Sequence, residues 1–229
     1  MRLSPLVAVA GVLLSAAPLG AVPAYARQTG FACSQCHSQH FPSLNEFGRH
    51  FKLDGFTLIG NSAKVEGTRL SLPAGLNASL FLKLRLQKTN GDDAANARST
   101  NSGELQFPDE FALLLAGRVS ENIGFILEGQ LPTGGAAVLA SFKMPFSYEV
   151  GRVQASVIPY TTDALGASYG FELLNTGAVR NIRFMEHRND FSAQQYVGTA
   201  TAASGAAFVV GNQRFFANLS VWSPIHLAA

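Results

Sequence analysis

The chain has 229 residues, with 17 Lys or Arg against 15 Asp or Glu, so its formal net charge is +2. A charge this close to neutral does not favour nucleic-acid binding, which needs a basic surface, and we expect no nucleic-acid partner. Charged residues make up 14% of the chain, against about 25% in an ordinary soluble domain. The length suits one domain, or a small domain beside a larger one.

The first 26 residues are typical of an export signal. Arg2 supplies a short positive region, residues 6–17 form an apolar run, and Ala24-Tyr25-Ala26 matches the A-x-A cleavage pattern. The apolar run is too short for a membrane-spanning helix. The sequence therefore predicts a signal peptide at residues 1–26, a mature chain that begins at Arg27, and a location outside the cytoplasm.

The next feature is a C-x-x-C-H motif formed by residues 33–37, in which the cysteines are Cys33 and Cys36 and the histidine is His37. This motif is the attachment site of c-type haem. Each thiol can form a thioether with one vinyl group of the porphyrin, and the histidine that follows can ligate the iron. We therefore predict one covalent haem c on Cys33 and Cys36, with His37 as an iron ligand, and we predict no catalytic residue.

Three other interpretations of the two cysteines, the only ones in the chain, remain open. One is a lone structural disulfide. Another is a thioredoxin-like redox pair, although such a pair follows a strand of a βαβ unit, and no such unit is legible. The third is half of a zinc site, although a structural site needs four ligands and no second C-x-x-C or H-x-x-x-H pair is present.

A helix is predicted shortly after the motif. Residues 43–46 fit a capping box with Ser43 as the N-cap. Leu44, Phe47 and Phe51 then recur at helical spacing, and Asp54-Gly55 is a stop signal. We expect the apolar face of this helix to pack against the haem.

His50 lies on the same helix, at the edge of its apolar face. A short turn at Phe41-Pro42 joins the helix to the haem motif, so the helix can fold back over the far side of the porphyrin. We therefore predict His50 as the distal ligand of the iron. The alternative is that its side chain merely packs or faces solvent.

From about residue 68 the hydropathy alternates with a period of two. Residues 76–86 place leucines on one face and mainly polar side chains on the other. A run of this length matches a tilted membrane-spanning strand of about 9–11 residues, whereas strands of soluble proteins are usually about 5–6 residues long. Turns are expected at 121–124 and 211–212, and a long polar loop at 88–104. Further strands are expected at 111–119, 125–131, 138–146, 152–160, 206–210 and 215–222.

The fold class is therefore predicted as mainly β: a membrane β-barrel whose plug is a small α-helical haem segment. Residues 27–66 would form the monohaem cytochrome c segment and residues 67–229 the outer-membrane barrel portion. Cations on the polar face of the strands, such as Arg118 and Lys143, would suit the haem propionates. An eight-stranded barrel is filled by its own side chains, and a plug needs a porin-sized barrel of about 16 strands. We therefore expect a portion of a longer barrel, with assembly from several copies as the alternative.

The residues around the motif resemble a known family. Arg27-Gln28-Thr29-Gly30 precedes the motif, Phe41-Pro42 follows it, and Leu44-Asn45-x-Phe47-Gly48-Arg49-x-Phe51-Lys52 leads to Gly55. This pattern is similar to the N-terminus of outer-membrane cytochrome–porin fusions, which include the outer-membrane iron oxidases of iron-oxidising bacteria. The resemblance is specific over roughly residues 27–60.

The resemblance implies a monohaem plug in an outer-membrane barrel of a Gram-negative bacterium. Electrons would pass from an extracellular donor such as Fe(II) to a periplasmic electron carrier, and an enzyme of this kind would be an Fe(II):cytochrome c oxidoreductase. The partners would also include outer-membrane lipid. Two alternatives stay open: a soluble periplasmic monohaem shuttle or haem sensor with a β-sandwich domain, and a haem enzyme that acts on a small molecule at an open iron position.

Overall fold

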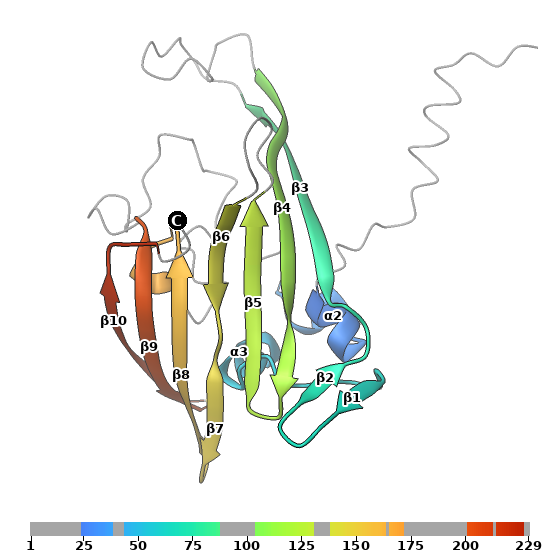
Figure 1. Cartoon of the computed structure of the whole chain (residues 1–229), viewed down its shortest axis with the longest axis vertical. Helices are drawn as coiled ribbons and strands as arrows, with labels where there is room; N and C mark the ends of the chain where they lie inside the picture. Colours follow the sequence, from blue (N-terminus) through green and yellow to red (C-terminus); the bar gives the residue numbers. More distant parts are fainter. Residues whose placement is uncertain are drawn as a thin grey trace, which may run out of the picture.

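The computed structural model describes residues 24–38, 44–87, 104–130, 138–163, 165–171, 201–212 and 214–226. Two short helices, α2 (Ala24–Thr29) and α3 (Glu46–Leu53), lie near one end of a large sheet (Figure 1). Two 3-10 turns, η1 (Cys33–Gln35) and η2 (Ala167–Tyr169), complete the helical structure of these residues. Strands make up most of the rest, which confirms the prediction of a mainly β fold. The strands are β1 (Lys64–Glu66), β2 (Ser71–Pro73), β3 (Ala78–Gln87), β4 (Glu104–Ser120), β5 (Ile123–Gln130), β6 (Val138–Lys143), β7 (Phe146–Val150), β8 (Val153–Thr162), β9 (Ala203–Gly211) and β10 (Phe216–Ser223).

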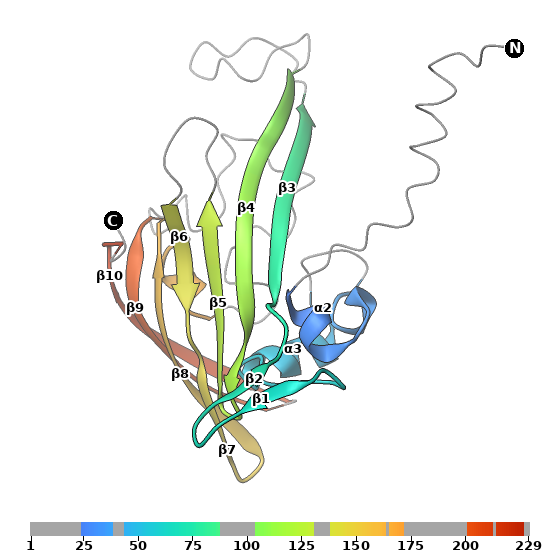
Figure 2. The same ribbon diagram turned by 45° about the vertical axis from the view of Figure 1, so that its right-hand side comes forward.

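The large sheet is antiparallel, with the strand order β10-β9-β8-β6-β5-β4-β3, and β7 pairs with both β5 and β8. Strands that follow one another in sequence are therefore mostly neighbours in space. Within the described residues β3 and β10 are the two edges and do not pair with each other. The sheet curves around the helices (Figure 2), and a closed barrel stays a prediction.

No helix within the described ranges combines the length and the apolar character that crossing a membrane requires.

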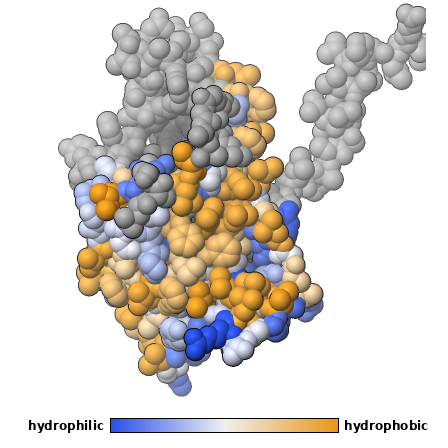
Figure 3. Space-filling model, viewed as in Figure 1, coloured by the Kyte–Doolittle hydropathy of each residue, from blue (hydrophilic) through white to orange (hydrophobic). Residues whose placement is uncertain are grey.

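The two faces of the sheet differ in chemistry. The face without helices, which we call the outer face, exposes large apolar side chains and is largely apolar in the space-filling view (Figure 3). The opposite or inner face is buried over β6, β8 and β9, where small and polar side chains lie beside an apolar cluster. The period-two alternation predicted from the sequence is thus present in the folded sheet. Exposed residues of the outer face include Leu80, Leu82, Leu84, Val157, Phe208, Val210, Leu219 and Val221, and buried residues of the inner face include Ser141, Lys143, Ser156, Ile158, Tyr160, Ala207 and Val209.

Two predicted strand boundaries are wrong. The strand expected at 111–119 begins at Glu104 and runs for 17 residues. The strand expected at 138–146 is divided into β6 and β7, with Met144 and Pro145 between them. Proline has no backbone N–H and interrupts a ladder, while the N–H of Met144 donates to Pro159 on β8 at 3.1 Å.

The short connections between strands gather at the end of the sheet where the helices lie (Figure 1). β4 and β5 are joined through Glu121 and Asn122, and β7 and β8 through Gly151 and Arg152. Gly151 has a φ of 67°, a conformation that glycine adopts without strain. Asn212 closes the β9–β10 connection, because its Oδ1 accepts from the N–H groups of the second and third residues after it.

The main core lies where α3 meets the inner face. Leu53 of α3 packs into a cluster contributed by β8, β9 and the segment around η2. Lys143 is almost fully buried beside this cluster: its Nζ donates to the carbonyl of Tyr169 at 2.9 Å and lies 4.5 Å from the centroid of that ring. Its ammonium is therefore held by η2. The cluster consists of Leu53, Ile158, Tyr160, Tyr169, Phe171, Ala203, Ala207 and Val209.

Candidate haem-attachment site

The C-x-x-C-H motif forms a single helical turn. The N–H groups of Cys36 and His37 both donate to the carbonyl of Cys33, at 3.1 and 3.0 Å. Residues i, i+3 and i+4 of a helical turn lie on one side of it, so the two thiols and the imidazole leave the turn on a common side. Cys33 is exposed, Cys36 is partly buried, and both carry thiols rather than a disulfide. These residues fit a haem that is bound through two thioethers and ligated by the adjacent histidine.

Burial shifts the acid–base behaviour of one of the two thiols. Burial, and to a smaller extent the charge of Cys33, raise the pKa of the Cys36 thiol above its ordinary value. A raised pKa is expected for the more buried thiol of any C-x-x-C motif, so this shift does not separate the haem-attachment interpretation from the redox-pair interpretation.

Asn45 joins the motif to α3. Its Oδ1 accepts from the N–H of Gly48 at 2.9 Å, so Asn45 is the N-cap of the helix. Its Nδ2 donates to the carbonyl of Gln35 at 3.0 Å, and its backbone N–H donates to the carbonyl of Cys36 at 2.9 Å. The prediction of Ser43 as the N-cap is wrong, because Asn45 can cap the helix and bind the motif turn at the same time; Ser43 itself lies outside the described residues.

Gly48 brings α3 into direct contact with the motif turn. A Cβ atom at this position would lie 2.2 Å from the carbonyl oxygen of Cys36. Only glycine permits this approach, because the atom in the way belongs to the backbone. His37 adds a second backbone connection, an isolated antiparallel bridge to Leu44. The motif is thus fixed on the first turn of α3.

The residues of the predicted apolar face of the helix pack in two different places. Phe47 packs edge-to-face on Phe31, with the ring centroids 5.7 Å apart, and Phe31 remains 39% exposed beside the motif. Phe51 turns instead into the protein, where it contacts Tyr25 at 5.2 Å and Phe56 at 5.7 Å. Of the described aromatic residues, Phe31 and Phe47 thus offer apolar surface to a porphyrin bound at the motif. Phe51 instead belongs to the core.

Gln28 is a structural residue of the N-terminal segment, which comprises α2, the motif turn and α3, and the sequence did not predict its role. Its side chain is fully buried, and its Nε2 donates to the carbonyls of Phe56 and Leu58, both at 2.7 Å. Its Oε1 accepts from the N–H of Arg118 on β4 at 2.7 Å. One amide thus connects α2, the segment after α3 and the sheet, which holds the N-terminal segment on the inner face. Its partners are 28–90 residues away in sequence, so no local pattern could reveal this role.

Arg118 also connects the sheet to the N-terminal part of the chain. Its guanidinium donates to the carbonyl and hydroxyl of Ser71, at 3.2 and 2.9 Å, and to the carbonyl of Thr57 at 3.2 Å. The sequence suggested that Arg118 and Lys143 would suit haem propionates. The contacts of the Arg118 guanidinium are with Ser71, Thr57 and, at 4.0 Å, Glu121, and those of Lys143 described above are with Tyr169 of η2.

His50 lies on a different side of α3 from the haem motif. Residues 48 and 50 are separated by about 200° around a helix of 3.6 residues per turn, and Gly48 is the residue that faces Cys36. His50 Nδ1 contacts Asp54 Oδ2 at 2.8 Å, and the side chain lines a cavity of about 460 Å³ beside Arg152, Gln154 and other residues of the short connections. The structure does not bring His50 to the Cys36 side, and distal ligation by His50 stays a prediction.

Substitution of His50 tests that prediction. If its imidazole completes the coordination of the iron, His50→Ala converts a low-spin haem spectrum to high-spin. His226→Ala is the matched control, because His226 is held by Thr161 and the carbonyl of Leu139 at 2.9 and 2.7 Å. An unchanged low-spin spectrum in His50→Ala would show that another residue is the distal ligand.

Asp54 predicts a pH dependence of stability. Burial raises the pKa of its carboxyl above the ordinary value of 3.8, and the neighbouring His50 lowers it part of the way back. Because the folded-state pKa is raised, this carboxyl favours folding most when it is protonated, and the contribution is lost as the pH rises from 3.8 through the folded-state pKa. Asp54→Asn should flatten that part of the curve of melting temperature against pH.

Glu66→Gln is the control for this measurement, since Glu66 is exposed at the surface beside Lys64. Identical pH profiles for Asp54→Asn and the unmodified chain would contradict the assignment.

Comparisons with known proteins add no identification to this geometry. No family model matches the chain, and neither the curated proteins nor the solved structures include a match. Within the described residues no group of three or more His, Cys, Asp or Glu side chains is arranged to hold a metal ion. The candidate site is therefore defined by its own residues: a C-x-x-C-H turn fixed to α3 and, through the N-terminal segment, to the inner face of a sheet.

Proposed function

We propose that the chain is an electron conduit of the outer membrane. One haem c, attached to Cys33 and Cys36 and ligated by His37, would accept electrons from an extracellular donor such as Fe(II) and pass them to a periplasmic electron carrier. The observation that carries the proposal is the combination of a haem-attachment turn and a sheet with an apolar outer face in one chain. A bound haem would supply a one-electron ferrous/ferric couple.

The residues of the plug have definite parts in this proposal. Cys33 and Cys36 would bind the haem, and His37 would ligate its iron. Asn45 and Gly48 keep the turn on α3, so the position of the haem follows the position of the helix. Rigid placement suits electron transfer, because a fixed site needs little rearrangement when the charge on the iron changes.

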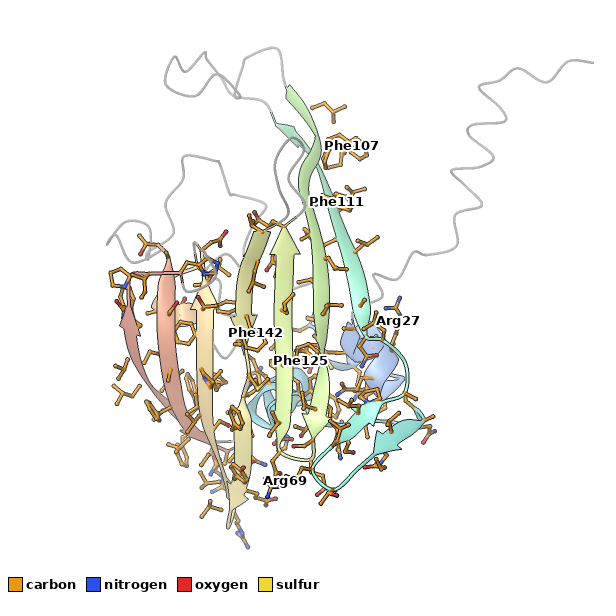
Figure 4. The ribbon with its side chains drawn as sticks, in the orientation of Figure 1. Arg27, Arg69, Phe107, Phe111, Phe125 and Phe142 are labelled. Carbon is orange, nitrogen blue, oxygen red and sulfur yellow. The ribbon has the colours of Figure 1, made fainter. Side chains whose placement is uncertain are left out.

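The outer face of the sheet supports the membrane part of the proposal. Phe107, Phe111, Phe125 and Phe142 lie along β4, β5 and β6, and the labelled cations Arg27 and Arg69 lie near the plug end (Figure 4). An apolar pocket of about 630 Å³ opens over β7–β10 on this face. The pocket is lined in part by Tyr148, Val157, Phe208, Val210 and Leu219.

The inner face supports the same interpretation. Ser141, Lys143 and Ser156 are buried there, and Ser141 donates to Glu128 at 3.4 Å. Such buried polar side chains are typical of the interior of outer-membrane barrels, although the inner face here also carries the apolar cluster around Leu53. A soluble β-sandwich buries its apolar side chains between two sheets and exposes polar ones, whereas large apolar side chains are exposed on the outer face of this sheet, which favours the conduit over the soluble shuttle.

The plug lies at the end of the short connections. In outer-membrane barrels the short turns face the periplasm and the long loops face outward. By this rule the haem turn would lie on the periplasmic side, where the exposed position of Cys33 would suit access by a soluble carrier. A small donor such as Fe(II) would then have to enter the barrel to come within electron-transfer range of the haem turn.

Proteoliposomes provide the test. The chain is produced together with the haem-attachment machinery, purified in detergent and reconstituted into vesicles that enclose oxidised cytochrome c. Fe(II) added outside should reduce the enclosed cytochrome, and the double variant Cys33→Ala/Cys36→Ala should not support this reduction. Release of the native protein from the cell envelope by salt alone, or equal reduction with the double variant, would overturn the proposal.

A further inference from the structure

Helix α2 includes residues that the expected signal-peptide cleavage would remove. The helix runs over six residues from Ala24 to Thr29, whereas cleavage after Ala26 leaves a chain that begins at Arg27. Ala24 is 4% exposed, comparable to the central residues of the main core. The first half of α2 is thus part of the folded plug.

Tyr25 has the most extensive contacts of this half. Its ring stacks on Phe56 with the centroids 4.8 Å apart, and it meets Phe51 edge-to-face at 5.2 Å. Its hydroxyl donates to the carbonyl of Phe125 on β5 at 3.3 Å. Burial, and to a smaller extent Tyr169, raise the pKa of this hydroxyl well above its ordinary value. Tyr25 therefore joins α3, the segment after it and the sheet.

The second half of α2 depends on the first for its hydrogen bonds. Thr29 Oγ1 donates to the carbonyl of Tyr25 at 2.8 Å, and the N–H of Gly30 donates to the carbonyl of Ala26 at 2.9 Å. Cleavage after Ala26 would remove both acceptors and leave three helical residues, fewer than one turn of 3.6 residues. Gln28, whose buried amide connects the plug to Arg118, would lose the helix that positions it.

We infer that the signal peptidase cuts on the N-terminal side of Tyr25, so that the mature protein begins no later than this residue. This inference rests on the export that the proposed function requires. Signal peptidases cut after small residues, and the sequence offers Ala21 and Ala24 as alternatives to Ala26. Cleavage after Ala21 retains the whole of α2, and cleavage after Ala24 retains Tyr25.

The intact mass and N-terminal sequence of the haem-loaded protein from the outer-membrane fraction test the inference. The expected first residue is Val22 or Tyr25. A first residue of Ala26 or Arg27 would overturn the inference and leave the proposed function standing, provided that the haem is present. A chain that retains Met1 would overturn both, because it would show that no signal peptide is removed.

Two substitutions give an independent measurement. Tyr25→Phe keeps the ring and loses one hydrogen bond, so the mature protein should be lighter by one oxygen atom and melt close to the unmodified protein. Tyr25→Ala removes the ring that stacks on Phe56 and should lower the melting temperature or the yield of folded protein. Cleavage after Ala26 would instead give mature proteins of unchanged mass and melting temperature from both variants.

Discussion

Gly48→Ala is expected to separate α3 from the haem-attachment turn. The added Cβ would lie 2.2 Å from the carbonyl oxygen of Cys36, and this oxygen cannot swing aside as a side chain can, because it belongs to the backbone that carries the motif. Overpacking of this kind costs about 1–3 kcal/mol, and we expect the upper end of that range. The melting temperature and the haem content of the purified protein should both fall.

The control for this substitution is Gly75→Ala. Gly75 has no heavy atom within 4 Å of the position that a Cβ would take, so the same chemical change meets open space. Gly75→Ala should therefore leave the melting temperature and the haem content close to those of the unmodified chain. Equal melting temperatures and haem contents of the two variants would contradict the close approach of α3 to the turn.

Leu82→Arg is expected to have the second large effect. Leu82 lies on β3, remains 54% exposed, and stands opposite Phe111 on the outer face. An Arg on the lipid face near the membrane midplane costs about 2–4 kcal/mol, whereas an Arg at an exposed position of a soluble sheet costs very little. The free energy of unfolding from lipid vesicles, measured by urea titration, should fall by about 2–4 kcal/mol.

Ser79→Arg serves as the control on the same strand. Its position differs by an odd number of residues from that of Leu82, so its side chain belongs to the inner face. We expect this variant to be tolerated, and Leu80→Arg to behave like Leu82→Arg, since Leu80 is also exposed on the outer face. Equal tolerance of arginine on both faces would indicate a sheet that is surrounded by water.

Most of the sheet could be predicted because alternation is a local signal. The strands expected at 125–131 and 152–160 begin and end within two residues of β5 and β8. The strand expected at 138–146 is divided in the structure, because Pro145 cannot donate a backbone hydrogen bond to the ladder. The 17-residue length of β4 is not predicted either, since Pro108, Asp109 and Glu110 interrupt the alternation that Glu104 to Phe107 begin.

The haem motif was predictable for the same reason: all of its residues lie within one turn of the chain. The contacts that hold the motif in place could not be predicted, because Gln28 and Arg118 are 90 residues apart in sequence. The sequence places Tyr25 in the signal peptide, because Ala24-Tyr25-Ala26 matches a cleavage pattern and the aromatic partners of Tyr25 come later in the chain. The N-cap Asn45 carries a local signal, because asparagine is as good an N-cap as serine.

The most direct test of the central claim is the mass of the mature protein produced together with the haem-attachment machinery. We predict that the mass exceeds that of the polypeptide by one haem, and that peptide mapping locates the haem on the fragment that contains Cys33 and Cys36. The variants Cys33→Ala and Cys36→Ala should each lack the doubly linked haem. A polypeptide without haem, in which a thiol-specific reagent modifies both cysteines, would contradict the account.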